Sequence, residues 1–198
     1  MRLGLMGGTF DPIHVGHLIL AEQARERFGL GKVLFVTAAN PPHKAGNGIS
    51  DVADRLEMTR LAVAGNAFFE CSTIEIERDG PSYTVDTIKQ ILGLYGPDAE
   101  VHLLLGADEG RDLMKWREPY EIQRLAKIVV ANRPGLPVAE VMGALPEGLA
   151  AGITPLEMPG VDISSTDLRE RVRSCRSIRY LVPRAVEEYI WSRGLYKG

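Results

Sequence analysis

The sequence predicts an α/β protein built on a doubly wound parallel sheet with helices on both faces. Two observations lead to this prediction. Strand-like and helix-like segments alternate along the chain, and strand-like segments such as Val101–Gly106 are continuous β-rich runs. Such runs are typical of strands buried on both faces, as in a parallel sheet covered by helices. The 198 residues fit one domain over residues 1–198, with a helical C-terminal segment from about 166 to 198.

The strand predictions follow the apolar runs in order. The first run ends at two glycines, and the later ones, such as Lys32–Thr37 (K-V-L-F-V-T) and Lys127–Asn132 (K-I-V-V-A-N), are rich in β-branched residues. The expected strands are Arg2–Met6, Lys32–Thr37, Phe68–Ile76, Val101–Gly106, Lys127–Asn132 and a sixth at Ile153–Met158.

Helices are expected between these strands. In Gly16–Phe28, an approximately helical apolar face is formed by Leu18, Leu20, Ala21, Ala24 and Phe28. In Val52–Ala64 the apolar side holds Leu56, Met58, Leu61 and Ala62. The remaining expected helices are Thr84–Leu94, Arg111–Lys115, Pro119–Ala126, Thr166–Ser174 and Pro183–Ser192. The segment Pro134–Gly152 is rich in Gly, Pro and Ala, so we expect a surface excursion there.

Composition excludes several classes of protein. A formal net charge of −3 argues against a broad nucleic-acid or membrane surface, so an anion site must be a local basic cluster. Cys71 and Cys175 are too few for a disulfide scaffold and form no C-x-x-C motif. Neither a transmembrane run nor a signal-peptide pattern is present. We expect a soluble cytoplasmic protein with reduced thiols; its oligomeric state is open, and a homo-oligomer is compatible with the sequence.

The stretch Gly7–His17 (G-G-T-F-D-P-I-H-V-G-H) follows the first apolar run. We expect a glycine-rich turn and then the first turn of a helix. Glycines let the backbone approach a bulky anion, and a helix N-terminus offers unpaired N–H groups and a positive dipole end. His14 and His17 are three residues apart and would share a helix face. The stretch predicts a nucleotide-phosphate site, although it matches neither G-x-G-x-x-G nor the P-loop pattern.

A second motif, Ile163–Arg169 (I-S-S-T-D-L-R), lies near the C-terminus. Ser165 or Thr166 can cap a helix whose early N–H groups face an anion, and Arg169 lies about one turn further on. The alternative is a plain helix cap followed by a solvated arginine. Residues that follow the predicted strands should converge at the carboxyl edge of the sheet. These are Gly7, Asn40–Lys44, Gly106–Asp108 and Asn132–Arg133.

The two motifs together resemble the nucleotidyltransferase superfamily with an H-x-G-H signature, which has a Rossmann-like nucleotidylyl transferase fold. Four further segments, in this order, are similar to bacterial nicotinate mononucleotide adenylyltransferases. They are P-P-H-K at Pro41–Lys44, E-x-x-R-x-G-P-S-Y-T-x-D-T at Glu75–Thr87, G-A-D at Gly106–Asp108 with Trp116 eight residues later, and R-P-G at Arg133–Gly135. The resemblance runs from Gly7 to about Arg169.

The resemblance implies transfer of the adenylyl group of ATP to nicotinate mononucleotide, a step of NAD biosynthesis. Implied catalytic residues are His14, His17, Lys44 and Arg169. Implied ATP-binding residues are Gly7, Gly8, Thr9, Phe10, His14, His17, Gly106, Asp108, Arg133, Ile163, Ser164, Ser165 and Arg169. Implied residues for nicotinate mononucleotide are Asp11, His43, Lys44, Tyr83, Thr84, Trp116 and Arg117. Mg²⁺ would bridge ATP oxygens, with no metal ligand expected from the protein.

Two departures from the family pattern concern the substrate pocket. Thr37-Ala38 stands where Pro-Ala often precedes P-P-H-K, and Arg117 stands where an aromatic residue often follows the tryptophan. The second departure leaves Trp116 as the main candidate for stacking on the pyridine ring.

Each residue also has a structural interpretation. Trp116 can be a core aromatic, Asp108 a strand-end cap, and His102 a structural residue in mid-strand. An ion pair among Glu75, Arg78 and Asp86 is as well supported as a functional role. Alternative functions are a nicotinamide mononucleotide or dual-specificity enzyme, a phosphopantetheine adenylyltransferase, whose family usually has T-x-G-H, and a non-catalytic nucleotide sensor.

Overall fold

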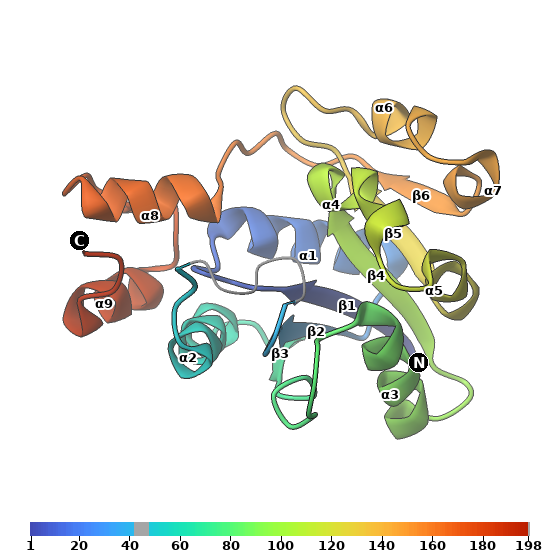
Figure 1. Cartoon of the computed structure of the whole chain (residues 1–198), viewed down its shortest axis with the longest axis horizontal. Helices are drawn as coiled ribbons and strands as arrows, with labels where there is room; N and C mark the ends of the chain where they lie inside the picture. Colours follow the sequence, from blue (N-terminus) through green and yellow to red (C-terminus); the bar gives the residue numbers. More distant parts are fainter. Residues whose placement is uncertain (42–47, 198) are drawn as a thin grey trace.

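A six-stranded, all-parallel sheet forms the centre of the computed structural model, which describes residues 1–41 and 48–197 (Figure 1). The strands are β1 Arg2–Gly8, β2 Lys32–Thr37, β3 Phe69–Ser72, β4 Glu100–Gly106, β5 Lys127–Ala131 and β6 Ile153–Leu156. Their order across the sheet is β3-β2-β1-β4-β5-β6. This arrangement confirms the predicted doubly wound parallel sheet.

The helices lie between and after the strands along the chain. They are α1 Val15–Phe28, α2 Val52–Val63, α3 Thr84–Tyr95, α4 Ala107–Arg111, α5 Pro119–Leu125, α6 Val138–Gly143, α7 Glu147–Ala150, α8 Ser165–Arg173 and α9 Arg184–Arg193, with a 3₁₀ turn η1 at Leu113–Lys115. Among the described residues, no helix is long and apolar enough to cross a membrane.

Two apolar cores lie on opposite faces of the sheet. Along β2, Leu34 and Val36 belong to one core, whereas Val33 and Phe35 belong to the other, as the alternation of strand side chains requires. The first core includes buried residues of α3, α5, α6 and α7, and the second includes those of α1, α2, α8 and α9. The C-terminal helices are therefore part of the globular core.

The order of the strands reverses between β1 and β4, which are hydrogen-bonded neighbours in the sheet. Gly8 at the end of β1 is in register with Thr37 at the end of β2. In open α/β sheets, the crevice beyond the carboxyl ends of the strands at such a reversal is where ligands bind. The fold therefore places the segments after β1, β2, β4 and β5 around one crevice.

Some predicted boundaries are wrong. Gly7 and Gly8 belong to β1, so the predicted turn begins only at Thr9. The third strand covers Phe69–Ser72 and not Phe68–Ile76, because residues from Thr73 onward form a turn in which the Ile76 N–H donates to the Thr73 carbonyl at 2.8 Å. The expected helix at Arg111–Lys115 is two elements, α4 and η1, separated at Asp112.

The segment Pro134–Gly152 is not a surface excursion. It forms α6 and α7, and its side chains Val138, Val141, Leu145 and Leu149 are buried in the first core. The glycines and prolines of this segment delimit two short helices, and the four apolar side chains cover the sheet beside β6.

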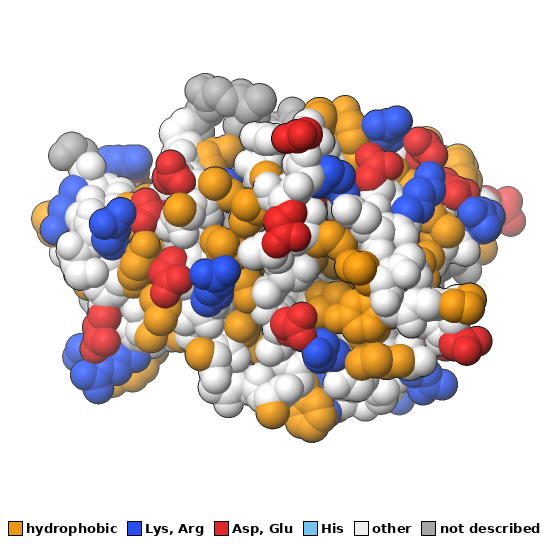
Figure 2. Space-filling view, turned by 90° about the horizontal axis from the view of Figure 1, so that it is seen from below, with side chains coloured by type: hydrophobic (Ala, Val, Ile, Leu, Met, Phe, Trp, Pro, Cys, Tyr) orange, Lys and Arg blue, Asp and Glu red, His pale blue; other side chains and the backbone are white. Residues whose placement is uncertain are grey.

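Charges of both signs are interspersed over the face of the molecule seen in Figure 2. This distribution agrees with the small net charge of −3. The face drawn presents no broad basic field of the kind that non-specific binding to nucleic acid requires.

A substitution at Gly110 tests how tightly α4 packs against the sheet. A Cβ at this position would lie 2.9 Å from Val130 Cγ1 and 3.3 Å from Val141 Cγ1. We predict that Gly110→Ala lowers the free energy of unfolding by about 1–3 kcal/mol, the usual effect of overpacking. The exposed Gly93 in α3 is a matched control, because a Cβ there meets nothing within 4 Å.

Gly93→Ala is expected to raise stability by roughly 0.5–1 kcal/mol, because alanine loses less conformational freedom in a helix. Urea denaturation of both variants measures the difference. Equal stabilisation by both substitutions would contradict the tight packing of α4.

Candidate functional site

A cavity of about 490 Å³ opens at the carboxyl ends of β1 and β4. Its size falls within the usual range for small-molecule sites. Eight of the residues predicted from the sequence line it: Gly7, Gly8, Thr9, Tyr83, Thr84, Asp108, Trp116 and Arg117. The cavity therefore joins the end of β1, the start of α3 and the α4–η1 segment, which are far apart in the sequence.

Trp116 is neither a wholly buried core residue nor a surface one. It is half-buried, packs against the first core and lines the cavity. Tyr83, immediately before α3, also packs against that core and lines the cavity. These aromatic side chains give the α3 end of the cavity an apolar surface on which a flat ring can pack.

The two histidines of the N-terminal motif lie together, but only His17 is in the helix. His14 is the residue before α1, and its ring stacks on that of His17 with 3.7 Å between centroids. The His14 backbone N–H donates to His17 Nδ1 at 3.2 Å. A neutral His17 ring therefore carries its proton on Nε2. Phe10, which is buried, contacts the His17 ring edge-on at 5.2 Å and fixes its orientation.

Burial keeps the His14 ring neutral. The side chain is 7% exposed, and its Nδ1 has no hydrogen-bond partner among the described residues. Burial, with a smaller contribution from the Arg133 cation, lowers the pKa of His14 from 6.5 to about 4. At neutral pH His14 is therefore an uncharged imidazole, which can donate one hydrogen bond.

The N-terminus of α1 has fewer open N–H groups than a free helix end. The Val15 N–H donates to the Leu181 carbonyl at 3.0 Å, and the His17 N–H donates to the His14 carbonyl at 3.0 Å. Two of the first three amide groups of the helix are thus bonded within the protein. The expected anion site here depends more on the imidazoles than on the helix amides.

Residues 9–12 are held by side chains from distant parts of the chain. Arg55, which is 2% exposed, donates to the carbonyls of Thr9 and Ala38 at 2.8 and 2.7 Å. The buried Asp11 carboxylate accepts from Tyr196 Oη at 2.7 Å and from the Ser50 N–H at 3.2 Å. Both Asp11 oxygens therefore have partners in the protein, and its predicted contact with nicotinate mononucleotide stays a prediction.

The second motif, Ile163–Arg169, contacts the same turn, residues 9–12. Ser165 Oγ donates to the Pro12 carbonyl at 2.9 Å, and Arg169 Nη1 donates to the Asp11 carbonyl at 2.7 Å. The residue that caps α8 is Ser164, whose hydroxyl accepts from the Asp167 N–H at 3.1 Å. The expectation that Ser165 or Thr166 caps this helix is therefore wrong by one or two positions. Ile163 is half-buried and packs against the second core.

Arg133 connects the ends of β4 and β5 by ion pairs. Its guanidinium is hydrogen-bonded to Asp108, which follows Gly106 at the end of β4, and to Asp162 at 3.1 Å. Although burial opposes it, these hydrogen bonds raise the pKa of Arg133. Asp108 is thus paired with a cation and is more than a strand-end cap.

Glu75, Arg78 and Asp86 form no ion pair with one another, so that structural alternative does not hold. Glu75 and Arg78 both meet the hydroxyl of Thr87, which donates to Glu75 Oε1 at 2.6 Å and accepts from Arg78 Nη2 at 3.2 Å. Asp86 instead lies 3.9 Å from Arg117 Nη1. Glu75 is 6% exposed and lines the cavity.

Some site residues were missed or lie outside the described chain. His43 and Lys44 lie outside residues 1–41 and 48–197, so the structure does not test their predicted roles. Arg55 and Tyr196 carried no recognisable signal in the sequence, because each acts through contacts made only after folding. His102 is buried in β4 and stacks on Phe28, as expected for a structural residue.

Comparison with known proteins agrees with this fold. The chain is a nucleotidyltransferase of the class described as cytidylyltransferase-like, whose family matches residues 5–171. A Desulfitobacterium hafniense protein named "Probable nicotinate-nucleotide adenylyltransferase" is 46% identical over 200 residues, covering 99% of this chain and 96% of that protein. A Thermus thermophilus protein of the same name is 47% identical over the full length of both. The chain belongs to the nicotinate-nucleotide adenylyltransferase family.

A solved structure supports the fold at lower sequence similarity. The Plasmodium falciparum nicotinic acid mononucleotide adenylyltransferase complexed with NaAD has a TM-score of 0.79 and 16% identity, covering 98% of this chain and 97% of that one. At this identity the match is evidence for the common fold.

The low pKa of His14 makes a prediction about stability and pH. Since the folded-state pKa is about 4 and the ordinary value is 6.5, protonation disfavours the native state. We predict that the contribution of His14 to the free energy of unfolding is fully present above pH 6.5. It should fall by about 3 kcal/mol as the pH is lowered toward 4.

The measurement is the free energy of unfolding between pH 4 and 7 for the native protein and for His14→Asn, which lacks this titration. The native protein should lose more stability than the variant on acidification. Parallel curves would show that His14 is not the responsible group.

Proposed function

We propose that this chain transfers the adenylyl group of ATP to the phosphate of nicotinate mononucleotide, giving nicotinate adenine dinucleotide and pyrophosphate, in cytoplasmic NAD biosynthesis. The observation that carries the proposal is the cavity at the β1/β4 reversal. One part of its wall is the glycine-rich end of β1 with Asp108, and another is the aromatic pair Tyr83 and Trp116. A dinucleotide product has two ends that fit these two parts. The family membership supports the same reaction.

The chemistry requires positioning and charge stabilisation. A phosphate oxygen of nicotinate mononucleotide attacks the α-phosphorus of ATP, and the bond to pyrophosphate breaks. Because the nucleophile is already an anion, no general base is needed. His14 and His17 would donate to phosphate oxygens as charge moves to the leaving group. Lys44 and His43 would neutralise the incoming phosphate, and Ser165 and Arg169 would hold pyrophosphate.

Mg²⁺ is proposed as the companion of ATP. Within residues 1–41 and 48–197, no three His, Cys, Asp or Glu side chains are grouped to hold a metal ion. Mg²⁺ is usually held through substrate phosphate oxygens with few protein ligands, so ATP would supply most of its ligands. When bound, it would neutralise charge on the phosphates.

The remaining proposed contacts orient the two substrates. Asp108 would accept hydrogen bonds from the adenosine ribose, after release from Arg133, and Phe10 and Gly106 would shape the ATP side. Trp116 would stack on the pyridine ring. Backbone N–H groups near Thr84 and Arg117 would bind the nicotinate carboxylate. An amide in its place would direct a donor at donors, a mismatch that can discriminate strongly.

The first test is pyrophosphate release with ATP and Mg²⁺, with nicotinate mononucleotide, nicotinamide mononucleotide and phosphopantetheine offered in parallel. Strong preference for the nicotinate substrate is the expected result. Equal rates with nicotinamide mononucleotide would agree with the proposed mechanism but would contradict selection for the carboxylate. Inactivity with all three would favour a nucleotide sensor.

His17→Ala tests the role of the imidazole pair. We predict that turnover falls by about 10²-fold, the usual effect of removing one donor to transition-state charge, while binding of nicotinate mononucleotide changes far less. His17→Gln is the matched control, because its amide can place an N–H near the position of Nε2 and should restore part of the rate. Steady-state kinetics with calorimetric binding separates the two effects; unchanged turnover in the alanine variant would remove His17 from the mechanism.

Trp116→Ala tests the assignment of the two ends of the cavity. Loss of stacking should raise the KM for nicotinate mononucleotide by roughly 3- to 10-fold and leave the KM for ATP nearly unchanged. The comparison requires initial rates with each substrate varied in turn. An equal loss for ATP would assign Trp116 to the core or to the other end of the cavity.

A further inference from the structure

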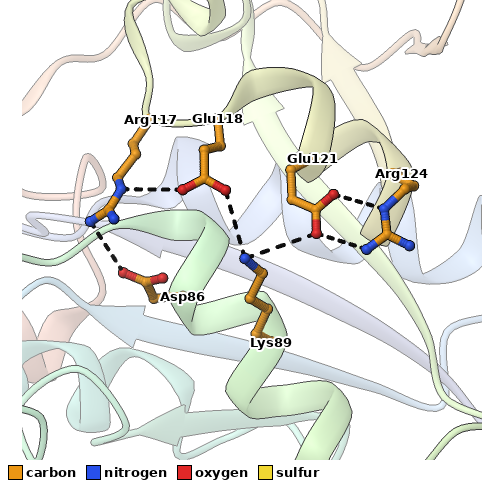
Figure 3. Close-up of polar contacts among 6 residues, drawn as sticks. All are labelled: Asp86, Lys89, Arg117, Glu118, Glu121 and Arg124. Carbon is orange, nitrogen blue, oxygen red and sulfur yellow. Dashed lines mark hydrogen bonds and ion pairs between the residues drawn. The ribbon is translucent and has the colours of Figure 1, made fainter.

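The guanidinium of Arg117 is held at the pyridine end of the cavity. It lies over the ring of Tyr83, with Cζ 4.7 Å from the ring centroid, and both side chains line the cavity. Figure 3 shows it reaching toward Asp86 of α3 and turning back to its neighbour Glu118. The ion pairs measure 3.9 Å to Asp86 and 3.3 Å to Glu118. A ring face and two carboxylates thus lie around this guanidinium, whose side chain is 51% exposed.

The same contacts leave hydrogen-bonding capacity on Arg117. Among the described residues, no hydrogen bond from its guanidinium meets ordinary geometry, and its two ion pairs are longer than the 2.7–2.9 Å typical of charge-assisted bonds. Two other cations near the cavity do form hydrogen bonds with carboxylates. Lys115 donates to Asp112 at 2.7 Å, and Arg133 is hydrogen-bonded to Asp108 and Asp162. Arg117 is therefore positioned but retains donors for a ligand.

An anionic substrate end needs such a cation here. The cavity wall includes four carboxylates, those of Glu75, Asp108, Glu109 and Asp112. It also includes two cations, Arg117 and Lys115, and Lys115 is bonded to Asp112. A carboxylate entering beside them is repelled unless a cation lies near its binding position. Arg117 occurs beside Trp116, where the pyridine ring is proposed to stack.

We propose that the Arg117 side chain is a specificity determinant that favours a pyridine carboxylate over a pyridine amide. The inference rests on the proposed function and deepens it, because it adds a side-chain charge to the backbone donors of the same end of the cavity. A planar guanidinium donates two parallel hydrogen bonds to a carboxylate, and such charge-assisted bonds are roughly twice as strong as neutral ones. An amide oxygen receives only the weaker kind.

A chain of ion pairs supports the position of Arg117. Glu118 also lies 3.7 Å from Lys89 of α3, and Lys89 lies 3.9 Å from Glu121 of α5. With the Asp86–Arg117 pair, the chain crosses three times between α3 and the segment that follows Trp116 (Figure 3). Charges alternate along it. The arrangement holds the loop carrying Arg117 against the helix that begins at Thr84.

The experiment measures the ratio of kcat/KM for nicotinate mononucleotide to that for nicotinamide mononucleotide, with ATP and Mg²⁺ saturating. Arg117→Gln is expected to lower the ratio about 10-fold, chiefly through the nicotinate substrate. Arg117→Lys, which keeps the charge, should lower it less. Lys115→Gln is the matched control: it removes the same charge two residues away, and the ratio should stay within about 2-fold of the native value.

Calorimetric binding of each mononucleotide without ATP gives a second readout. Weaker binding of the nicotinate form alone in Arg117→Gln supports the proposal. An unchanged ratio, an equal loss for both mononucleotides, or an equal change in Lys115→Gln would overturn it. Failure of the proposed function is distinguishable, because the native protein would then release no pyrophosphate with either mononucleotide.

Discussion

The turn at residues 9–12 is the constraint on which the rest of the site depends. It links the central strand β1 to α1, and its polar groups are buried. A buried carboxylate at Asp11 and a buried guanidinium at Arg55 are costly unless each is hydrogen-bonded. Tyr196 and Ser50 satisfy the first, and backbone carbonyls satisfy the second. Burial lowers the pKa of Arg55 and raises that of Tyr196, so Tyr196 keeps the proton that it donates to Asp11.

This turn explains why the C-terminal part of the chain belongs to the site. Ser165 and Arg169 of α8 bond to the carbonyls of residues 12 and 11, and Leu181 accepts the first amide N–H of α1. The histidines lie at the start of α1, so their position depends on contacts made more than 150 residues later. The geometry of the proposed phosphate site is thereby coupled to the packing of the C-terminal part of the chain.

The sequence predicted what local patterns determine. The strands were recognisable because a buried parallel strand needs a continuous apolar run, and the site residues after β1 and β4 converged because carboxyl ends of parallel strands share an edge. A helix boundary that depends on one hydrogen bond could not be recognised from the sequence. At the start of α8, for example, the capping residue is Ser164 and not the predicted Ser165. The Asp11–Tyr196 bond joins residues 185 apart, and no spacing rule reports such a contact. The apolar residues of α6 and α7 were hidden by the glycines and prolines around them.

The neutral state of His14 is consistent with the chemistry proposed for the site. Two imidazoles stacked at 3.7 Å repel each other when both are charged, and the nearby Arg133 cation adds to that repulsion. Adenylyl transfer to a phosphate moves no proton, so the reaction needs hydrogen-bond donors and has no use for a titrating base. A neutral imidazole is a donor whose charge stays constant over the physiological pH range. The positive charge for the phosphates would then come from Mg²⁺ and from arginine and lysine side chains.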